Sequence, residues 1–226
     1  MLRFSLEDAR GNLVASRDAL LSTGYPPFQW QPQMFVRDWS TIRLPANLAD
    51  GIYTLKLAVA RENVLLGSTL LPFVPTIVNL GEVEIKNRAR VMTAPNVERT
   101  LEAVFDNKMK LLGYATQTSA SPHRVQVTLY WRALAPMDTA YTVFIHLLDA
   151  ENRLVVAGDA PPGLGDLPTT GWIENEYITD VHPLALDDVP PGTYRLEIGV
   201  YDPLTGARLK TSDGADHLRL TTLQLP

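Results

Sequence analysis

Three pairs of aspartates recur at matching positions in the first and second parts of the chain, and they are the first candidates for chemistry. The pairs are Asp8 and Asp149, Asp18 and Asp159, and Asp38 and Asp180. Two carboxylates at a suitable separation can hydrolyse a glycosidic bond. An aspartate at the start of a turn instead accepts hydrogen bonds from nearby backbone groups and stabilises the turn. Because the same aspartates occur twice, a role in folding is the favoured interpretation, and a glycoside hydrolase is the remote alternative.

The four histidines could act as acids, bases or metal ligands near neutral pH. They are His123, His146, His182 and His217. A metal site needs ligands that converge at fixed distances, and we expect His146 and His182 to lie on strands that could be neighbours. Asp159 and Asp180 would then be close to them. The favoured alternative is a structural histidine that is hydrogen-bonded inside a β-sandwich.

The sequence lacks the motifs of the common catalytic and cofactor sites. There is no cysteine, which excludes disulfides, thiolate catalysis and cysteine-ligated zinc. There is also no P-loop, no GxGxxG motif that opens a helix, no GxSxG and no HExxH. The glycine-rich segment 162–166 has no lysine after it and is predicted to be a turn. We therefore expect no catalytic residue, no metal and no cofactor.

Aromatic residues give the sequence its one candidate ligand surface. Trp30 and Trp172 precede predicted strands within loops rich in proline and glycine. An exposed loop tryptophan can stack on the apolar face of a sugar. Trp172 with Tyr177, extended by Tyr130 and Arg132 from the outward face of a strand, are therefore candidate ligand contacts. The alternative is that each tryptophan closes the end of its sandwich, and its recurrence favours that interpretation.

The composition is that of a globular protein with many strands and turns. Of 226 residues, 46 % are apolar and 20 % are charged, and 17 prolines and 14 glycines fall between short apolar runs. A net charge of −5 without a basic stripe argues against nucleic acid as a partner. Prolines interrupt the uncharged run 63–81, so we expect two strands and a turn there and no membrane insertion. The first residues lack the apolar core of a signal peptide.

The chain contains an internal repeat. An offset of 141 positions places Leu6 on Leu147, and the match extends past Gly51 and Gly192 with one insertion and one compensating deletion. The shared structural positions are Trp30, Asp38, Gly51 and Tyr53, which match Trp172, Asp180, Gly192 and Tyr194. The sequence thus predicts a partial unit at 1–86, a linker at 87–98 and a complete unit at 99–226.

Alternating apolar residues predict strands in both units. Segments 53–59, 125–133 and 194–200 have the period of two that is typical of a half-buried strand. A hairpin is predicted over 101–114 with its turn at 106–107, and a bulge at 221–222. Tyr53 and Tyr194 each follow a turn in the manner of a tyrosine corner. We predict an all-β fold of two tandem immunoglobulin-like, Greek-key β-sandwich units, with a jelly roll as the alternative.

The first unit has no counterpart of residues 99–141 and is predicted to be incomplete on its N-terminal side. An incomplete sandwich exposes strand edges that can pair with another chain. We therefore expect either a homodimer through the exposed strand edges of the first unit or a tightly packed interface between the two units.

Five segments of the second unit carry a resemblance to a known family. They are KLLGY at 110–114, VTLYW at 127–131, YTVFIHLLD at 141–149, PTTGW at 168–172 and PGTY at 191–194. In this order they resemble the extracytoplasmic β-sandwich domain that follows the membrane region of some bacterial glycosyltransferases of the dolichyl-phosphate-mannose mannosyltransferase type. The resemblance covers 99–226 fully and 1–86 through the repeat.

The resemblance implies an accessory role outside the cytoplasm, in the cell envelope. It implies no catalytic residue, because such enzymes place their catalytic acids in the membrane part. The expected function is therefore a non-catalytic accessory or interaction module with a protein partner. A carbohydrate-binding module that contacts a glycan through the aromatic residues is the alternative.

Overall fold

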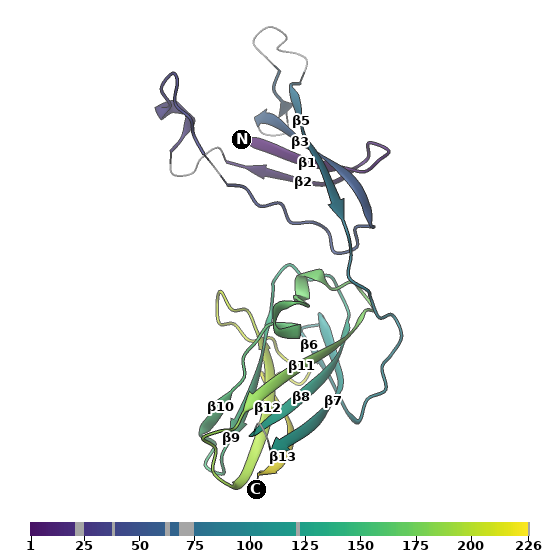
Figure 1. Ribbon diagram of the computed structural model, residues 1–226, viewed down its shortest axis with the longest axis vertical. Coiled ribbons are helices and arrows are strands. Elements are labelled where there is room, and N and C mark those ends of the chain that lie inside the picture. Colours follow the sequence, from purple (N-terminus) through teal and green to yellow (C-terminus); the bar gives the residue numbers. More distant parts are fainter. Residues whose placement is uncertain (21–24, 38, 62–63, 68–74, 121–122, 226) are drawn as a thin grey trace. The chain divides into compact units, whose positions relative to one another are not determined.

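The computed structural model describes residues 1–20, 25–37, 39–61, 64–67, 75–120 and 123–225. It divides into two compact units, Met1–Arg88 and Ala89–Pro226 (Figure 1). The described residues form strands and three short 3-10 helices, and no α-helix. The predicted all-β fold is therefore confirmed.

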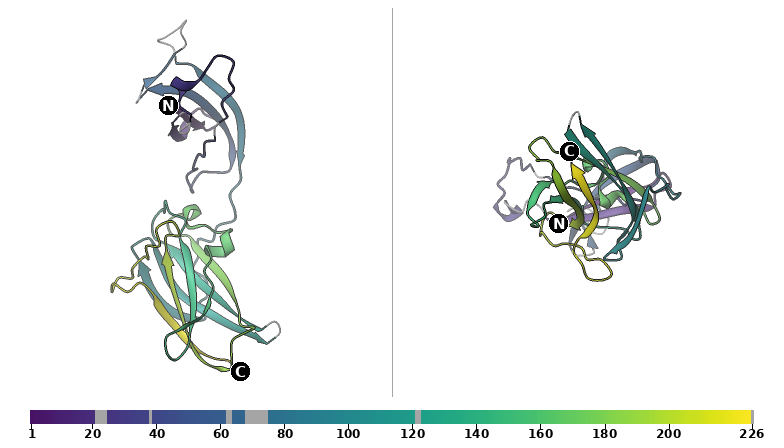
Figure 2. Two further views of the ribbon diagram at one scale, coloured as in Figure 1. Left: turned by 90° about the vertical axis from the view of Figure 1, so that its left-hand side faces the viewer. Right: turned by 90° about the horizontal axis from the view of Figure 1, so that it is seen from below.

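Unit 2 is a sandwich of two four-stranded antiparallel sheets, which Figure 2 shows from two further sides. The first sheet has the order β10 (Leu154–Ala157), β9 (Thr142–Leu148), β12 (Gly192–Tyr201), β13 (Leu218–Leu225). The second has the order β11 (Tyr177–Ala185), β8 (His123–Ala133), β7 (Met109–Ala120), β6 (Arg99–Phe105). Two 3-10 helices, η2 (Pro162–Gly165) and η3 (Thr169–Gly171), lie between β10 and β11. The finer assignment as immunoglobulin-like or jelly roll stays a prediction.

The core of unit 2 lies between its two sheets. On β8 every second residue from Val125 to Ala133 is buried, as the alternation predicts, and Trp131 is among them. Leu196 and Ile198 of β12 belong to the same apolar cluster. Fully burying a leucine or valine side chain contributes about 1.5–3 kcal/mol, so this interior dominates the stability of the unit.

The predicted hairpin is confirmed as β6 and β7, joined at Asp106 and Asn107. Both turn residues have positive φ, 43° and 54°, and the Lys108 amide donates to the Phe105 carbonyl at 2.9 Å. Two consecutive residues in the left-handed backbone conformation match the right-handed twist of the flanking strands. Aspartate and asparagine adopt this conformation more readily than most residues.

The described residues of unit 1 form a single sheet. Its strands are β1 (Leu2–Glu7), β2 (Leu13–Ala19), β3 (Gly51–Arg61), β4 (Val64–Leu65) and β5 (Ile77–Ile85). The order is β2-β1-β3, with β5 and the short β4 both paired to β3. Between β2 and β3 the described residues form only the 3-10 helix η1 (Pro27–Gln29).

The strand pairs of this sheet occur in the same register as those of the first sheet of unit 2. Leu2 pairs with Val59 and Leu6 with Leu55 in unit 1. The residues 141 positions later do the same, because Val143 pairs with Val200 and Leu147 with Leu196.

The irregularities of the ladders also coincide. The ladder of β1 with β2 shifts after Leu6, where the ladder of β9 with β10 shifts after Leu147. β3 and β5 shift after Leu55, and β12 and β13 shift after Leu196. The predicted bulge near the C-terminus is thus present, but its extra residue is Leu220 and not one of residues 221–222. Leu220 is buried in the core, which sets the bulge one position earlier.

Both predicted tyrosine corners are present. The Tyr53 hydroxyl donates to the carbonyl of Ala49 and the Tyr194 hydroxyl to the carbonyl of Pro190, each at 2.8 Å. Both side chains are buried. Each bond fixes the turn that leads into the central strand of its sheet.

Candidate functional site

The sheet of unit 1 has one apolar face, defined here as the unit 1 apolar face. In-register pairs place Leu2 beside Val59, Phe4 beside Leu57, and Leu57 beside Val78 on the same side. Leu6, Leu55 and Leu80 continue this row of apolar side chains. Part of this face is exposed to solvent, because the exposed fractions of Val59, Val78 and Leu80 are 43 %, 48 % and 47 %.

The matching face of unit 2 is covered by its second sheet. Val200, the counterpart of Val59, is 0 % exposed, and Leu220, the counterpart of Leu80, is 8 % exposed. Both pack in one cluster with Leu129 and Trp131 of β8. The same row of residues is therefore an interior in one unit and a partly open surface in the other.

The opposite face of the unit 1 sheet is polar. Arg3 of β1 donates two hydrogen bonds to the carboxylate of Asp18 on β2, at 2.7 and 2.6 Å. Lys56 of β3 forms an ion pair with Glu7. The bond from Arg3 holds the pKa of Asp18 below its ordinary value. Leu13, Leu65 and Ile77 lie beside Arg3 and Asp18 and line a pocket with them.

The segment 35–43 matches β11 in the sequence but forms no strand in its described residues, 35–37 and 39–43. Phe35 is fully exposed and Trp39 is 80 % exposed, with the guanidinium of Arg37 over the Trp39 ring at 4.6 Å. In unit 2, all nine residues of β11 pair with β8. Unit 1 has no strand that corresponds to β8 among its described residues.

Asp180 lies in a buried polar network of unit 2. Its carboxylate accepts hydrogen bonds from the Gly163 amide at 2.8 Å and from the Trp131 indole at 3.3 Å. The Nε2 atom of His182 is 2.8 Å from the same carboxylate. Asp180, His182 and Trp131 are all buried, so the network connects η2 to two strands inside the protein. Asp38, the counterpart of Asp180, is outside the described residues.

The structure does not bring His146 and His182 together. His146 is on β9 and His182 on β11, which belong to different sheets. Their strands are therefore not hydrogen-bonded neighbours, because the chain changes sheets between β10 and β11. Each has its own aspartate, and His146 Nε2 is 3.2 Å from Asp159. The described residues contain no group of three or more histidine, cysteine or acidic side chains that could hold a metal ion.

Asp8 and Asp149 have the same role in the two units. One oxygen of Asp8 accepts from the amides of Arg10 and Asn12, at 2.9 and 2.8 Å. One oxygen of Asp149 accepts from the amides of the residues two and four positions later, at 3.0 and 2.8 Å. Asn12 holds the pKa of Asp8 below its ordinary value, as the Arg153 amide does for Asp149. These carboxylates close turns.

The structure separates Trp172 from the other candidate ligand contacts. Trp172 is 0 % exposed, and its indole donates to the Leu167 carbonyl at 2.8 Å. The favoured interpretation is therefore confirmed for Trp172, because the side chain fills the end of the sandwich core, and its ring is not exposed for sugar stacking. Trp30 makes the same bond to the carbonyl five residues before it, Tyr25, at 2.8 Å, but its ring is 38 % exposed.

The other three candidates lie together on the outward face of β8 and β11. Tyr177 pairs with Arg132, and the guanidinium carbon of Arg132 is 6.0 Å from the centre of the Tyr177 ring. Tyr130 is two residues along on the same side of β8. All three side chains are half-buried, and Arg132 also donates to Asn175 at 2.5 Å. They form a small surface of two phenol rings and one cation.

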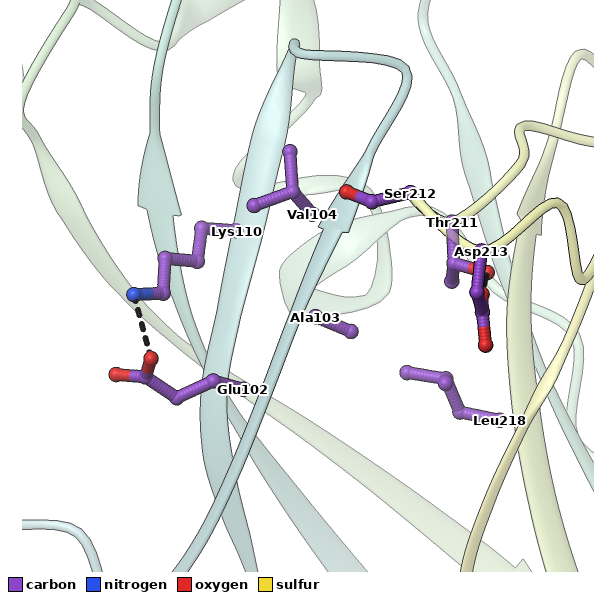
Figure 3. A pocket seen from close by; sticks show the side chains of 8 residues that line it. All are labelled: Glu102, Ala103, Val104, Lys110, Thr211, Ser212, Asp213 and Leu218. Atoms are coloured by element: carbon purple, nitrogen blue, oxygen red, sulfur yellow. Dashed lines mark hydrogen bonds and ion pairs between the residues drawn. The ribbon is translucent and has the colours of Figure 1, made fainter.

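A pocket of about 320 Å³ opens between β6 and the loop before β13 (Figure 3). Lys110 and Glu102 line one side and bond to each other at 2.8 Å. Thr211 and Asp213 line the other side, and the Thr211 hydroxyl donates to Asp213. The Lys110–Glu102 bond and the Thr211–Asp213 bond thus each lie within one side of the pocket.

No protein-family model matches the chain, and none of the curated proteins matches it. None of the helices in the described part of the chain is long and apolar enough to span a membrane. Among the described residues, the unit 1 apolar face is the strongest candidate functional site. The sequence signal for this face was the match of Val59 and Leu80 to residues of a predicted core, in a unit with too few strands to cover them.

Proposed function

We propose that this chain is a non-catalytic interaction module that binds a protein partner through the unit 1 apolar face. The proposed setting, from the family resemblance, is the cell envelope, as an accessory to a glycosyltransferase. The observation that supports the module is the exposure of Val59, Val78 and Leu80 on a sheet face whose counterpart in unit 2 is buried.

The energy available at this face is appreciable. Completing the burial of three aliphatic side chains that are about half exposed contributes roughly 2–4 kcal/mol. Neighbouring residues of the face, such as Phe4 and Leu57, are themselves only half-buried and add to it. A partner that covers the face therefore gains hydrophobic stabilisation without disturbing the charged side of the sheet.

The polar residues that could do chemistry are engaged in the fold. Asp8 and Asp149 bond the backbone of their own turns. Asp180 holds η2 through the Gly163 amide. These contacts support an architectural role for the recurrent aspartates.

Site-specific photo-cross-linking in intact cells tests the proposed function. A photoreactive amino acid at Val78 on the unit 1 apolar face is expected to give one defined protein adduct. The matched control is the same amino acid at Ser16 on the polar side of the sheet, which is expected to give none. Val59→Asp is expected to abolish the Val78 adduct. Equal labelling from both faces, or no adduct from either, would contradict the proposal.

The proposed location has its own test. Intact cells that contain the native protein are treated with a membrane-impermeant, lysine-reactive reagent. Modification of exposed Lys86 in intact cells to the extent seen after lysis is expected, and protection until lysis would place the chain inside the cytoplasm.

A second candidate function is glycan binding at Tyr130, Arg132 and Tyr177. The observation in its favour is the Tyr177 ring at 6.0 Å from the Arg132 guanidinium, on a sheet face that also carries Tyr130. A glycan array with the wild-type chain and a Tyr177→Ala variant tests it. Binding that is lost in this variant and kept in Thr179→Ala on the same strand would support the second candidate, and absence of binding to any glycan would remove it.

A further inference from the structure

We propose that the partner of unit 1 is a three-stranded antiparallel β-sheet of the kind formed by β6, β7 and β8, supplied from outside residues 1–226. It covers the unit 1 apolar face, and its edge strand pairs with segment 35–43, so that a two-layered sandwich results. This inference rests on the proposed function and names the class of partner.

The first support is the agreement of strand registers. The sheet formed by β2, β1, β3 and β5 has the pairings and the bulges of the sheet formed by β10, β9, β12 and β13. In unit 2 the inner face of that sheet is covered by β6, β7, β8 and β11. Two faces with the same backbone arrangement and the same apolar rows are suited to the same kind of cover.

The second support is the state of segment 35–43. β11 is an edge strand whose partner in its sheet is β8. Ile178 and Leu184 of β11 are buried, whereas their counterparts Val36 and Ile42 are half-buried. A segment with the sequence pattern of an edge strand forms a strand only when a neighbouring strand pairs with it. An antiparallel strand in the position that β8 occupies in unit 2 would provide this pairing.

This second observation distinguishes a strand donor from a second copy of the chain. Two copies that stacked their unit 1 apolar faces would bury Val59 and Leu80. They would add no strand beside residues 35–43, which would keep their present conformation. A three-stranded sheet would both cover the unit 1 apolar face and place a strand beside residues 35–43.

The partner's chemistry follows from the face it covers. Its three strands need apolar side chains at alternate positions on one side, as Val125, Val127 and Leu129 provide on β8. The strand that pairs with 35–43 runs antiparallel to it, as β8 does to β11. Its other side is exposed to solvent and needs polar residues.

The chain itself supplies a probe of this kind. A fusion protein with a second copy of residues 97–141 placed directly before Met1 gives unit 1 the three strands that precede β9 in unit 2. Amide hydrogen exchange in peptides that cover 35–43 is expected to slow at least tenfold. The fluorescence of bound anilinonaphthalene sulfonate, which reports exposed apolar surface, is expected to fall.

The control is the same fusion with Val127→Asp and Leu129→Asp in the added copy only, which removes the apolar side of its third strand and is expected to leave exchange unchanged. Protection of β12 in unit 2, which the added copy does not contain, shows in the same experiment that the fusion protein is folded. Residues 97–141 added as a separate peptide are a second probe, for which the same slowing is expected.

Two results would overturn the inference. One is unchanged exchange of 35–43 with both probes while β12 stays protected. The other is a dimer of the unmodified chain in which Val59 and Leu80 are buried. Either can occur while the cross-link at Val78 persists, in which case the interaction module stands and its partner is of another class. Loss of the cross-link with slowed exchange would instead remove the proposed function.

Discussion

The carboxylate of Asp180 joins three parts of unit 2 that are distant in the sequence. It accepts bonds from Gly163 in η2 and from Trp131 on β8, and it lies beside His182 on its own strand. A buried carboxylate with several donors stabilises the fold, whereas loss of one partner leaves another group unsatisfied.

Asp180→Asn is expected to destabilise unit 2 by roughly 2–4 kcal/mol, because the new amide presents a donor to the indole of Trp131. Urea unfolding followed by tryptophan fluorescence measures the change. Asp188→Asn, at an exposed position, is the control and is expected to shift stability by less than about 0.5 kcal/mol. Equal effects would show that the network contributes nothing.

The turn aspartates predict a dependence of stability on pH. The pKa of Asp149 is below its ordinary value of 3.8, mainly because the Arg153 amide donates a hydrogen bond to the carboxylate. A group with a lowered folded-state pKa stabilises the protein above its unfolded-state pKa, and this contribution disappears as pH falls through the folded-state pKa. Stability is therefore expected to decrease on acidification below the ordinary value.

Asp149→Asn tests that dependence. The variant is expected to be less stable than the wild type at neutral pH and to lose less stability on acidification, because the titrating carboxylate is gone. The urea midpoint at neutral pH and at pH values below the ordinary pKa gives the comparison. Parallel curves for the two proteins would count against the assigned role.

Single residues were predictable from the sequence where a local pattern determines them. The tyrosine corners depend on a short turn followed by a strand, so Tyr53 and Tyr194 were found. The recurrence of the tryptophan favoured burial in both units, and Trp172 is buried, but Trp30 stays 38 % exposed. The separation of His146 from His182 depends on the path of the chain between sheets, which is a non-local property.

At the scale of elements, one facing pair of residues packs differently in the two sheets with matching registers. Gly199 of β12 lies opposite Phe144 of β9, and a methyl group on Gly199 would be 2.2 Å from the Phe144 ring. The corresponding pair in unit 1 is Ala58 opposite Arg3. The flexible arginine can move away from a methyl group, whereas the packed ring cannot.

Gly199→Ala is therefore expected to destabilise unit 2 by about 1–3 kcal/mol through overpacking. In the double variant with Phe144→Leu the cost is expected to be smaller than the sum of the two single changes, because the smaller side chain removes the contact with the ring, although the Asp216 carbonyl at 2.8 Å remains. Chemical unfolding of the four proteins gives the coupling energy. Additive effects would show that the ring and the methyl group do not meet.

Strands were predictable from the period-two pattern, as β8 and β12 show. The segment 35–43 shows the limit of that signal. Its sequence matches β11, yet its described residues form no strand, because a strand is stabilised by its neighbour as well as by its own residues. No local pattern reveals that the neighbour is missing.

At the scale of the whole molecule, matching residues of the two units differ in their expected tolerance to charge. Leu80→Lys on the unit 1 apolar face is expected to change stability by less than about 0.5 kcal/mol, since the side chain already reaches water. Leu220→Lys at the matching position of unit 2 is expected to cost more than about 3 kcal/mol, because it places a charge in the core. Thermal unfolding of both variants measures the difference. Equal costs would mean that the unit 1 face is covered in solution.

Because the two units share strand registers, their strands could pair wrongly during folding. The pair Phe144 and Gly199 reduces this risk. Strands of similar sequence in one chain can exchange partners, and such misassembly is a common kinetic trap of tandem domains. If β9 paired with β3 in place of β12, the Phe144 ring would face Ala58 and clash with its methyl group. The bulky ring and the glycine that accommodates it thus disfavour the pairing of β9 with β3 and favour its pairing with β12.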